Sequence, residues 1–219
     1  MTIKDVEALL SGLTDAERHA LLRVLRERYG VNVHPLEQRW NTTAEAILEA
    51  IDQSSDLTQR GIRGVLAEAT FRTVVLPEKL QRWKEQLSVA DQSFDLMLTD
   101  DVGQVRVQVK LQRKERGAPK LYRGEPDQYV VETQRTRGGK RPDQEASRPY
   151  RIGEFDVLAV CLHPSTGDWT SFIYCASRDL LRRANNPQLL EVLQPVPMND
   201  PTAWNRDFEF VVRRFRETT

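Results

Sequence analysis

A carboxylate, an amide and an ammonium group are brought together by a hairpin pattern in the middle of the chain. In the second strand of this pattern aliphatic residues alternate with polar ones, so Gln108 and Lys110 project from the same polar face. A tight turn after Thr99 pairs it with Gln104, and counting back along the first strand places Asp95 opposite Gln108. Oxygen ligands beside a fixed positive charge suit metal-assisted hydrolysis of a phosphodiester. The pattern therefore predicts a metal-dependent nuclease site on this hairpin.

With Glu68 on the preceding predicted helix, these residues resemble the PD-(D/E)XK nuclease superfamily, and within it the type II restriction endonucleases. The resemblance covers mainly 60–114, with weaker support from 150–174. In that family an acid on one strand, a second acid two residues before a lysine on the next strand, and often a helical glutamate gather around a divalent metal. Asp95 fits the first position, Lys110 fits the lysine and Glu68 fits the glutamate.

The chain departs from the family pattern at two places. The residues before Asp95 are not the family's proline, which shapes the backbone and carries no chemistry. Gln108 stands where a second acid is usual, and its amide oxygen ligates a metal without adding negative charge. The resemblance implies a Mg²⁺ site made by Asp95, Gln108 and Glu68, with Lys110 orienting the attacking water. The alternative for Glu68 is the solvated face of an amphipathic helix.

The charges of the chain are sorted along it. The net charge is +0, yet the segment 105–151 holds thirteen Lys or Arg against six Asp or Glu, so it is strongly basic and the remainder is acidic. Basic side chains release counterions from DNA and steer it toward the site. The segment therefore predicts double-stranded DNA as the partner, and a solvated basic loop is the alternative.

The predicted DNA contacts fall into three groups by residue type. Side chains that read base edges occur at Glu132, Gln134, Arg135 and Arg137. Side chains that suit phosphate contacts follow at Lys140, Arg141, Arg148 and Arg151. Basic residues that directly follow the hairpin complete the set, at Arg113, Lys114, Arg116, Lys120 and Arg123.

The elements that position these residues are read from periodicity and capping signals. Predicted helices cover 3–11, 14 to about 28, 43 to about 54, a stretch from 56 or 58 through 71, a short piece around Trp83, and 177 to about 184. Core strands are expected at 155–163 and 169–175, and a helix or strand at 207–215. This order predicts an α/β (α+β) fold, with a mixed central sheet flanked by helices. We expect an N-terminal helical region over 1–55 and a nuclease core over 56–219.

Composition and missing motifs exclude other classes. With 39% hydrophobic and 29% charged residues, the chain is typical of a globular protein, and no apolar run is long enough for a signal or a membrane span. We therefore expect a cytoplasmic protein. Cys161 and Cys175, in predicted neighbouring strands, are expected to be small core residues and form no zinc motif. Walker and GxSxG motifs are lacking, and the three histidines have no metal-ligand spacing.

The expected function is that of a Mg²⁺-dependent, sequence-specific endodeoxyribonuclease of a restriction–modification system. The alternatives are a repair or structure-specific nuclease on the same core, and a DNA-binding protein that has lost catalysis. Cutting two antiparallel strands at a symmetric site favours a homodimer. Apolar residues of the N-terminal helices could form its interface or pack on the core, among them Leu9, Leu13, Leu21, Leu22 and Leu25.

Overall fold

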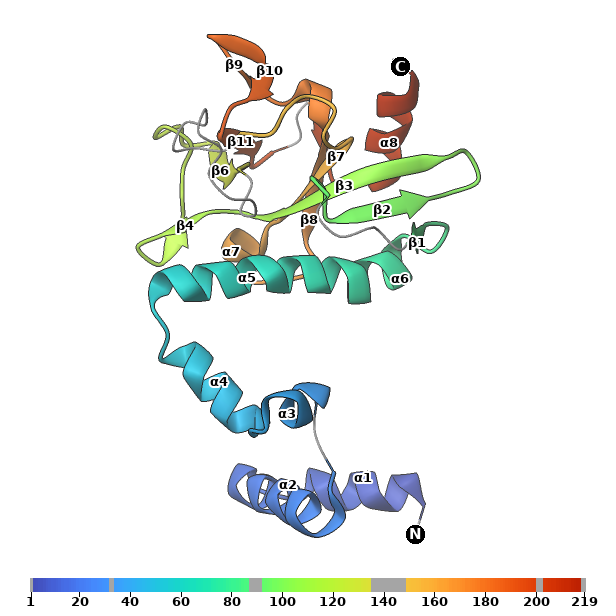
Figure 1. Cartoon of the computed structure of the whole chain (residues 1–219), viewed down its shortest axis with the longest axis vertical. Helices are drawn as coiled ribbons and strands as arrows, with labels where there is room; N and C mark the ends of the chain where they lie inside the picture. Colours follow the sequence, from blue (N-terminus) through green and yellow to red (C-terminus); the bar gives the residue numbers. More distant parts are fainter. Residues whose placement is uncertain (1, 32–33, 87–91, 135–148, 200–202, 218–219) are drawn as a thin grey trace. The chain divides into compact units, whose positions relative to one another are not determined.

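Two compact units make up the chain, Met1–Gln59, here the N-terminal unit, and Arg60–Thr219, here the sheet unit. The computed structural model describes residues 2–31, 34–86, 92–134, 149–199 and 203–217. Figure 1 shows helices alone in the N-terminal unit and a sheet with flanking helices in the other. The predicted mixed fold is thus confirmed. Among the described residues, no helix is long and apolar enough to cross a membrane.

Local capping determines the helices of the N-terminal unit. They are α1 (Ile3–Ser11), α2 (Asp15–Tyr29), α3 (Pro35–Trp40) and α4 (Ala44–Asp52). Thr14 and Glu17 form a capping box at the start of α2, and Gly30, with a φ of 64°, ends it in the left-handed conformation. The predicted bounds of α1, α2 and α4 are confirmed to within a few residues.

The short helix α3 was not predicted, because its pattern is too brief to show a period. A buried carboxylate, that of Glu37, accounts for its position. It accepts a hydrogen bond from the Ala44 N–H at 2.9 Å and forms an ion pair with Arg26 at 2.8 Å. These contacts join α2, α3 and the first turn of α4.

The central sheet of the sheet unit has six strands in the order β1-β2-β3-β7-β8-β12. Their bounds are β1 (Lys84–Gln86), β2 (Leu96–Thr99), β3 (Gln104–Leu111), β7 (Val157–Cys161), β8 (Phe172–Ala176) and β12 (Trp204–Asn205). β3 and β7 run parallel, and the other neighbours are antiparallel. Thr99 pairs with Gln104 and Leu96 with Val107, so the predicted hairpin register is confirmed.

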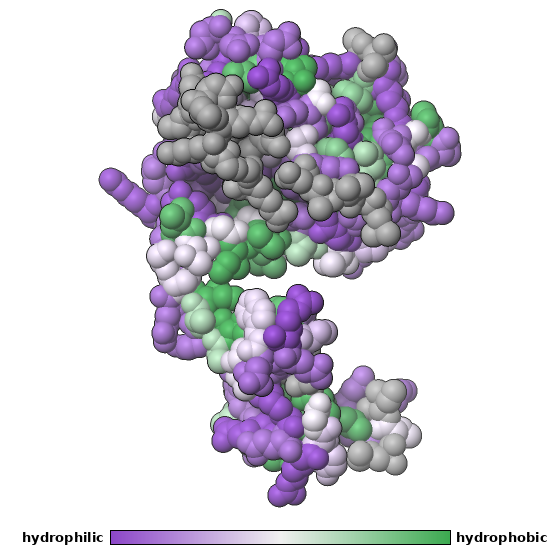
Figure 2. Space-filling view, in the orientation of Figure 1, coloured by the Kyte–Doolittle hydropathy of each residue, from purple (hydrophilic) through white to green (hydrophobic). Residues whose placement is uncertain are grey.

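Helices cover one face of this sheet. They are α5 (Asp56–Thr70), a π-helical turn η1 (Phe71–Val75), α6 (Leu76–Lys79) and α8 (Phe208–Glu217). Ala67 and Phe71 are fully buried against the aliphatic row of β3. Val65 and Leu66 of the same helix are 62% and 44% exposed, so they do not belong to this core. In Figure 2 hydrophobic atoms gather over α5, on an otherwise largely hydrophilic surface.

A second cluster fills the opposite face, beneath smaller strands and turns. These are β6 (Gln128–Glu132), β11 (Leu193–Pro197), β9 (Arg182–Arg183), β10 (Asn186–Leu190) and η2 (Ser177–Asp179). The short helix α7 (His163–Thr166) follows β7, and its His163 ring stacks on Trp169, which packs against the first core cluster. β6 pairs with β11, and β9 pairs with β10. Cys161 belongs to the first core cluster and Cys175 to the second, so both are core residues on opposite faces of the sheet.

Two predicted helices are wrong, and each fails for a tertiary reason. Trp83 does not lie in a helical piece, because α6 ends at Lys79 and the chain then enters the edge strand β1, which pairs with β2. The helix expected from Ser177 is a single 3₁₀ turn, after which β9 begins. The segment 207–215, expected as helix or strand, is the helix α8.

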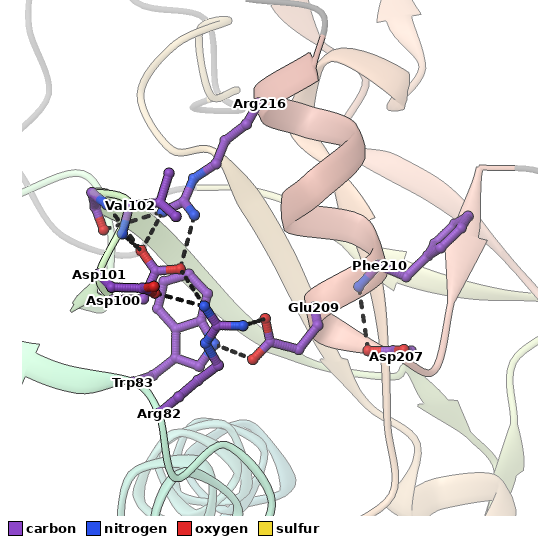
Figure 3. A network of polar contacts seen from close by, with 10 residues as sticks. Arg82, Trp83, Asp100, Asp101, Val102, Asp207, Glu209, Phe210 and Arg216 are labelled. Atoms are coloured by element: carbon purple, nitrogen blue, oxygen red, sulfur yellow. Dashed lines mark hydrogen bonds and ion pairs between the residues drawn. The ribbon is translucent and has the colours of Figure 1, made fainter.

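Helix α8 is tied to the tip of the β2–β3 hairpin by an ion network (Figure 3). Both guanidinium Nη atoms of Arg216 donate to the Asp100 carboxylate at 2.8 Å, and one also donates to the Gly103 carbonyl at 3.1 Å. In the first turn of α8, the Glu209 carboxylate accepts a hydrogen bond from Trp83 Nε1 at 2.7 Å. Hydrogen bonds from Arg216 hold the pKa of Asp100 well below its usual range, although burial opposes this. The network therefore stabilises the turn that sets the hairpin register.

We expect Arg216→Met to lower the free energy of unfolding by about 3 kcal/mol, because it leaves the Asp100 carboxylate buried without its main partner. Urea unfolding measures this. Arg213→Met, on an exposed position of the same helix, should change it by less than about 0.5 kcal/mol. Equal losses in the two variants would contradict the assigned role.

The same carboxylate predicts a pH dependence of stability. The pKa of Asp100 is lower in the folded protein than its ordinary value of 3.8. The ionised carboxylate therefore stabilises the fold above that pH, and this stabilisation is lost as the pH falls toward the folded-state pKa. Below about pH 4 the wild type should therefore lose stability more steeply than Asp100→Asn. If the free energy of unfolding of the two proteins falls equally with pH below about pH 4, the role of Asp100 is contradicted.

Candidate active site

The hairpin places Asp95 directly before β2 and opposite Gln108 of β3. The Asp95 N–H donates to the Val107 carbonyl at 3.0 Å, which extends the ladder by one step. The Asp95 Oδ2 atom accepts hydrogen bonds from the Gln108 side-chain amide and from the Val109 N–H, the latter at 2.8 Å. The carboxylate is therefore oriented by two donors of β3. With its nitrogen facing Asp95, the Gln108 amide keeps its carbonyl oxygen as the atom suited to a cation.

Lys110 lies on the same face of β3 as Gln108, because side chains two residues apart in a strand point to the same face of the sheet. Burial lowers the pKa of the Lys110 ammonium, while the carboxylates of Asp95, Glu68 and Glu132 raise it. Its Nζ atom lies 5.7 Å from the centre of the Tyr150 ring. A buried cation set among carboxylates is a charge held in place, which is what stabilisation of a developing anion requires.

Glu68 reaches this group from the last turns of α5, with 28% of its side chain exposed. Arg72 at the start of the π-helical turn holds it: the guanidinium contacts Glu68 at 3.1 Å, Glu85 at 2.8 Å and the Asp95 carbonyl at 3.2 Å. One arginine thus connects the helix, the edge strand β1 and the hairpin. The sequence interpretation missed Arg72, although its spacing of four residues from Glu68 is a helical ion-pair signal.

Gln112 continues the polar row of β3 beyond Lys110 and was also missed as a site residue. Its side chain is 1% exposed, and neither amide atom has a hydrogen-bond partner among the described residues. A buried carboxamide without partners costs stability, so its presence beside Lys110 is notable. The alternation that identified Gln108 and Lys110 places Gln112 on the same face, and that signal was sufficient to include it.

The basic segment is partly described, and its residues differ in their partners. Glu132 forms an ion pair with Arg113 at 2.7 Å and accepts a hydrogen bond from the Gln134 side chain. Lys120 forms an ion pair with Glu115 at 2.7 Å. Exposed cations occur at Lys114, Arg116, Arg123 and Arg151. Five predicted DNA contacts lie outside the described residues, namely Arg135, Arg137, Lys140, Arg141 and Arg148.

The side chains at this site form a donor set for a hard cation. Mg²⁺ in proteins takes one or two carboxylates and fills its shell with water and substrate phosphate. The carboxylate of Asp95, the amide oxygen of Gln108 and the nearby carboxylate of Glu68 fit this requirement, and they lack the nitrogen and sulfur ligands of a zinc site. In the described ranges no group of three or more His, Cys, Asp and Glu side chains is arranged to hold a metal. The proposed ligand set therefore combines an amide oxygen with carboxylates.

No protein-family model matches the chain, and no curated protein matches it. Among solved structures, the chain is similar to a bacterial homing endonuclease, with 23% sequence identity and a TM-score of 0.34. The match covers 53% of this chain and 66% of the other, so it spans just under two thirds of that protein. This likeness is too partial to assign a role to any side chain of the site.

Proposed function

We propose that this protein is a Mg²⁺-dependent endodeoxyribonuclease that cuts double-stranded DNA at a short sequence, as type II restriction enzymes do. The observation that supports it most is the arrangement of Asp95, Gln108 and Lys110, in which one hairpin presents a fixed carboxylate, an amide and a buried ammonium on one polar face. The exposed cations that follow the hairpin would hold the DNA backbone.

Each side chain has a distinct task in this proposal. Asp95, Gln108 and Glu68 would hold Mg²⁺, which supplies a Lewis acid and an acidified water when bound. Lys110 would orient the attacking water and offset the charge that builds on the phosphoryl oxygens. Arg72 positions Glu68 and the Asp95 backbone through its three contacts. Burial lowers the pKa of Lys110, and the carboxylates of Asp95, Glu68 and Glu132 oppose that shift.

Incubation of supercoiled and linear plasmid with the protein, with and without Mg²⁺, tests the proposal. Discrete bands that need Mg²⁺ are expected. A structure-specific or repair nuclease would instead nick or degrade without fixed fragments. Binding without any cutting would favour the second candidate, a DNA-binding protein without catalysis, which the amide at Gln108 makes a real alternative. EDTA treatment and re-addition of Mg²⁺ is the control.

Gln108 brings no negative charge to the proposed metal site. Glu68 is expected to supply the second carboxylate. Glu68→Ala should slow cleavage by about tenfold or more and raise the Mg²⁺ midpoint, since loss of even a group that only orients a metal ligand typically costs that much. Gln108→Glu should keep or improve Mg²⁺ binding by adding a charge. Titration of the cleavage rate with Mg²⁺ measures both. A Glu68→Ala enzyme with the wild-type rate and midpoint would leave Glu68 as a partner of Arg72 alone.

We further propose that the active species is a homodimer, with one site for each strand. The N-terminal helices retain exposed apolar side chains suited to such an interface, including Leu9 at 60% and Leu22 at 37% exposure. Light scattering on a cognate duplex is expected to give two chains per duplex. One chain per duplex with both strands cut would show a monomer that acts on the strands in turn.

A further inference from the structure

A small ribbon of two short strands follows β3, and its residues from Lys114 to Ala118 are exposed. β4 (Lys114–Glu115) and β5 (Ala118–Pro119) pair in an antiparallel register that leaves Arg116 and Gly117 as a two-residue turn. The φ angles of these two residues are 49° and 85°, and two central residues with positive φ define a type I′ turn. Figure 1 shows the ribbon projecting from the sheet unit at β4.

A second turn of the same kind lies a few residues later. The Glu125 N–H donates to the Tyr122 carbonyl at 2.8 Å, so Arg123 and Gly124 are its central residues, with φ angles of 49° and 84°. The segment is anchored at its base, where the Val130 N–H donates to the Lys120 carbonyl at 3.0 Å. It therefore forms a folded arm with an arginine at each tip.

Arginine is an unfavourable residue for these positions. The first central residue of a type I′ turn is normally Asn, Asp or Gly, because a larger side chain with positive φ is strained. Arg116 is exposed, and no hydrogen bond or ion pair within the described residues engages its guanidinium. Lys120 is the largest cause that lowers the pKa of the neighbouring Glu115, and the charge of Arg116 is the smallest. This weak attraction does little to offset the strain, which is the situation expected of a residue kept for a ligand.

The position of the arm limits what that ligand is. Arg116 follows Lys110 by six residues of extended chain, a reach of at most about 20 Å. Along B-form DNA this corresponds to about six base pairs, so a duplex that runs from Lys110 toward the tip would meet Arg116 within that distance. The major groove admits a two-stranded ribbon, and an arginine there binds the O6 and N7 atoms of guanine with two hydrogen bonds.

We propose that the β4–β5 ribbon enters the major groove of the DNA substrate and that Arg116 at its tip reads a guanine within about six base pairs of the cut. Arg123 at the second tip supplies a phosphate contact that holds the arm in the groove. This inference rests on the proposed function, because it takes duplex DNA as the substrate.

The decisive variant is Arg116→Asn, because asparagine suits the first position of a type I′ turn. The melting temperature is expected to stay equal or rise, while affinity for the cognate duplex falls about tenfold. Arg116→Lys keeps the charge but cannot bind guanine in the same two-pronged way, so it should keep non-specific affinity and lose the guanine preference. Arg213→Gln on α8 is the matched control, since it removes one exposed positive charge outside the arm.

Selection of bound duplexes from a randomised pool, followed by sequencing, reads the preference directly. Wild type should enrich a motif with a guanine position that both Arg116 variants lose and the Arg213 control keeps. Arg123→Asn should weaken binding to all sequences and lower the salt dependence of log Kd by about one unit. Unchanged motifs and affinities in the Arg116 variants, with DNA still bound and cut, would overturn this inference alone. Failure of the wild type to bind DNA would instead overturn the proposed function.

Discussion

Asp95→Ala is expected to abolish DNA cleavage while DNA binding stays nearly intact. Loss of this carboxylate removes the best-oriented oxygen of the proposed metal site, which the Gln108 side chain and the Val109 N–H hold in place. The cost to the transition state should be on the order of 3 kcal/mol, which corresponds to a loss of at least about 100-fold in the cleavage rate. Single-turnover cleavage and a binding assay in Ca²⁺ or EDTA measure the two effects separately.

Asp101→Ala is the matched control for this variant. Asp101 belongs to the turn of the same hairpin, and 77% of its side chain is exposed, so its loss should change cleavage little. Thermal unfolding of both variants ensures that the hairpin is intact. Substantial residual cutting by folded Asp95→Ala protein would rule out the proposed site.

Lys110→Met is expected to reduce cleavage to a similar extent, because it removes a buried ammonium that interacts with the carboxylates of Asp95 and Glu68. Lys110→Arg should not restore the rate, since a planar guanidinium cannot take the place of a compact ammonium among three carboxylates. Lys84→Met, on the exposed edge strand, controls for the loss of one positive charge. Cleavage by Lys110→Met at the rate of the Lys84 control would exclude a catalytic role for Lys110.

The pH profile gives Lys110 a second readout. A protonated ammonium is required, so activity should fall as the pH rises through the pKa of Lys110, which burial lowers. The Glu132 carboxylate raises that pKa, and Glu132→Gln should therefore move the alkaline limb of the cleavage rate to lower pH. An alkaline limb that stays in place would mean that another group controls it.

Local signals in the sequence were enough for the hairpin and for the helix ends. Strict alternation with a tight turn allows only one register that buries the aliphatic row, which is why the pairing of Thr99 with Gln104 and the meeting of Asp95 with Gln108 could be predicted. The capping box at Thr14 and the left-handed Gly30 are likewise satisfied within one turn of chain. Signals of this kind need no distant partner.

The surroundings of that hairpin were decided by contacts distant in sequence. The parallel pairing of β3 with β7 joins residues about fifty positions apart, and it gives the Lys110 row a covered face instead of a solvated one. Burial of Gln112, the guanidinium of Arg72 between Glu68 and Glu85, and the edge strand at Trp83 all follow from packing between elements. None of these partners lies within the window over which a periodic pattern can be read.

The sequence by itself therefore determined which chemical groups this protein brings to its site, because side-chain types and strand alternation are local properties. Only the tertiary structure decided their electrical surroundings, because burial, opposing charges and the orientation of an amide depend on which distant segments pack against the strand. The turn at Arg116 was likewise decided by the tertiary structure, because its positive φ follows from the pairing of β4 with β5.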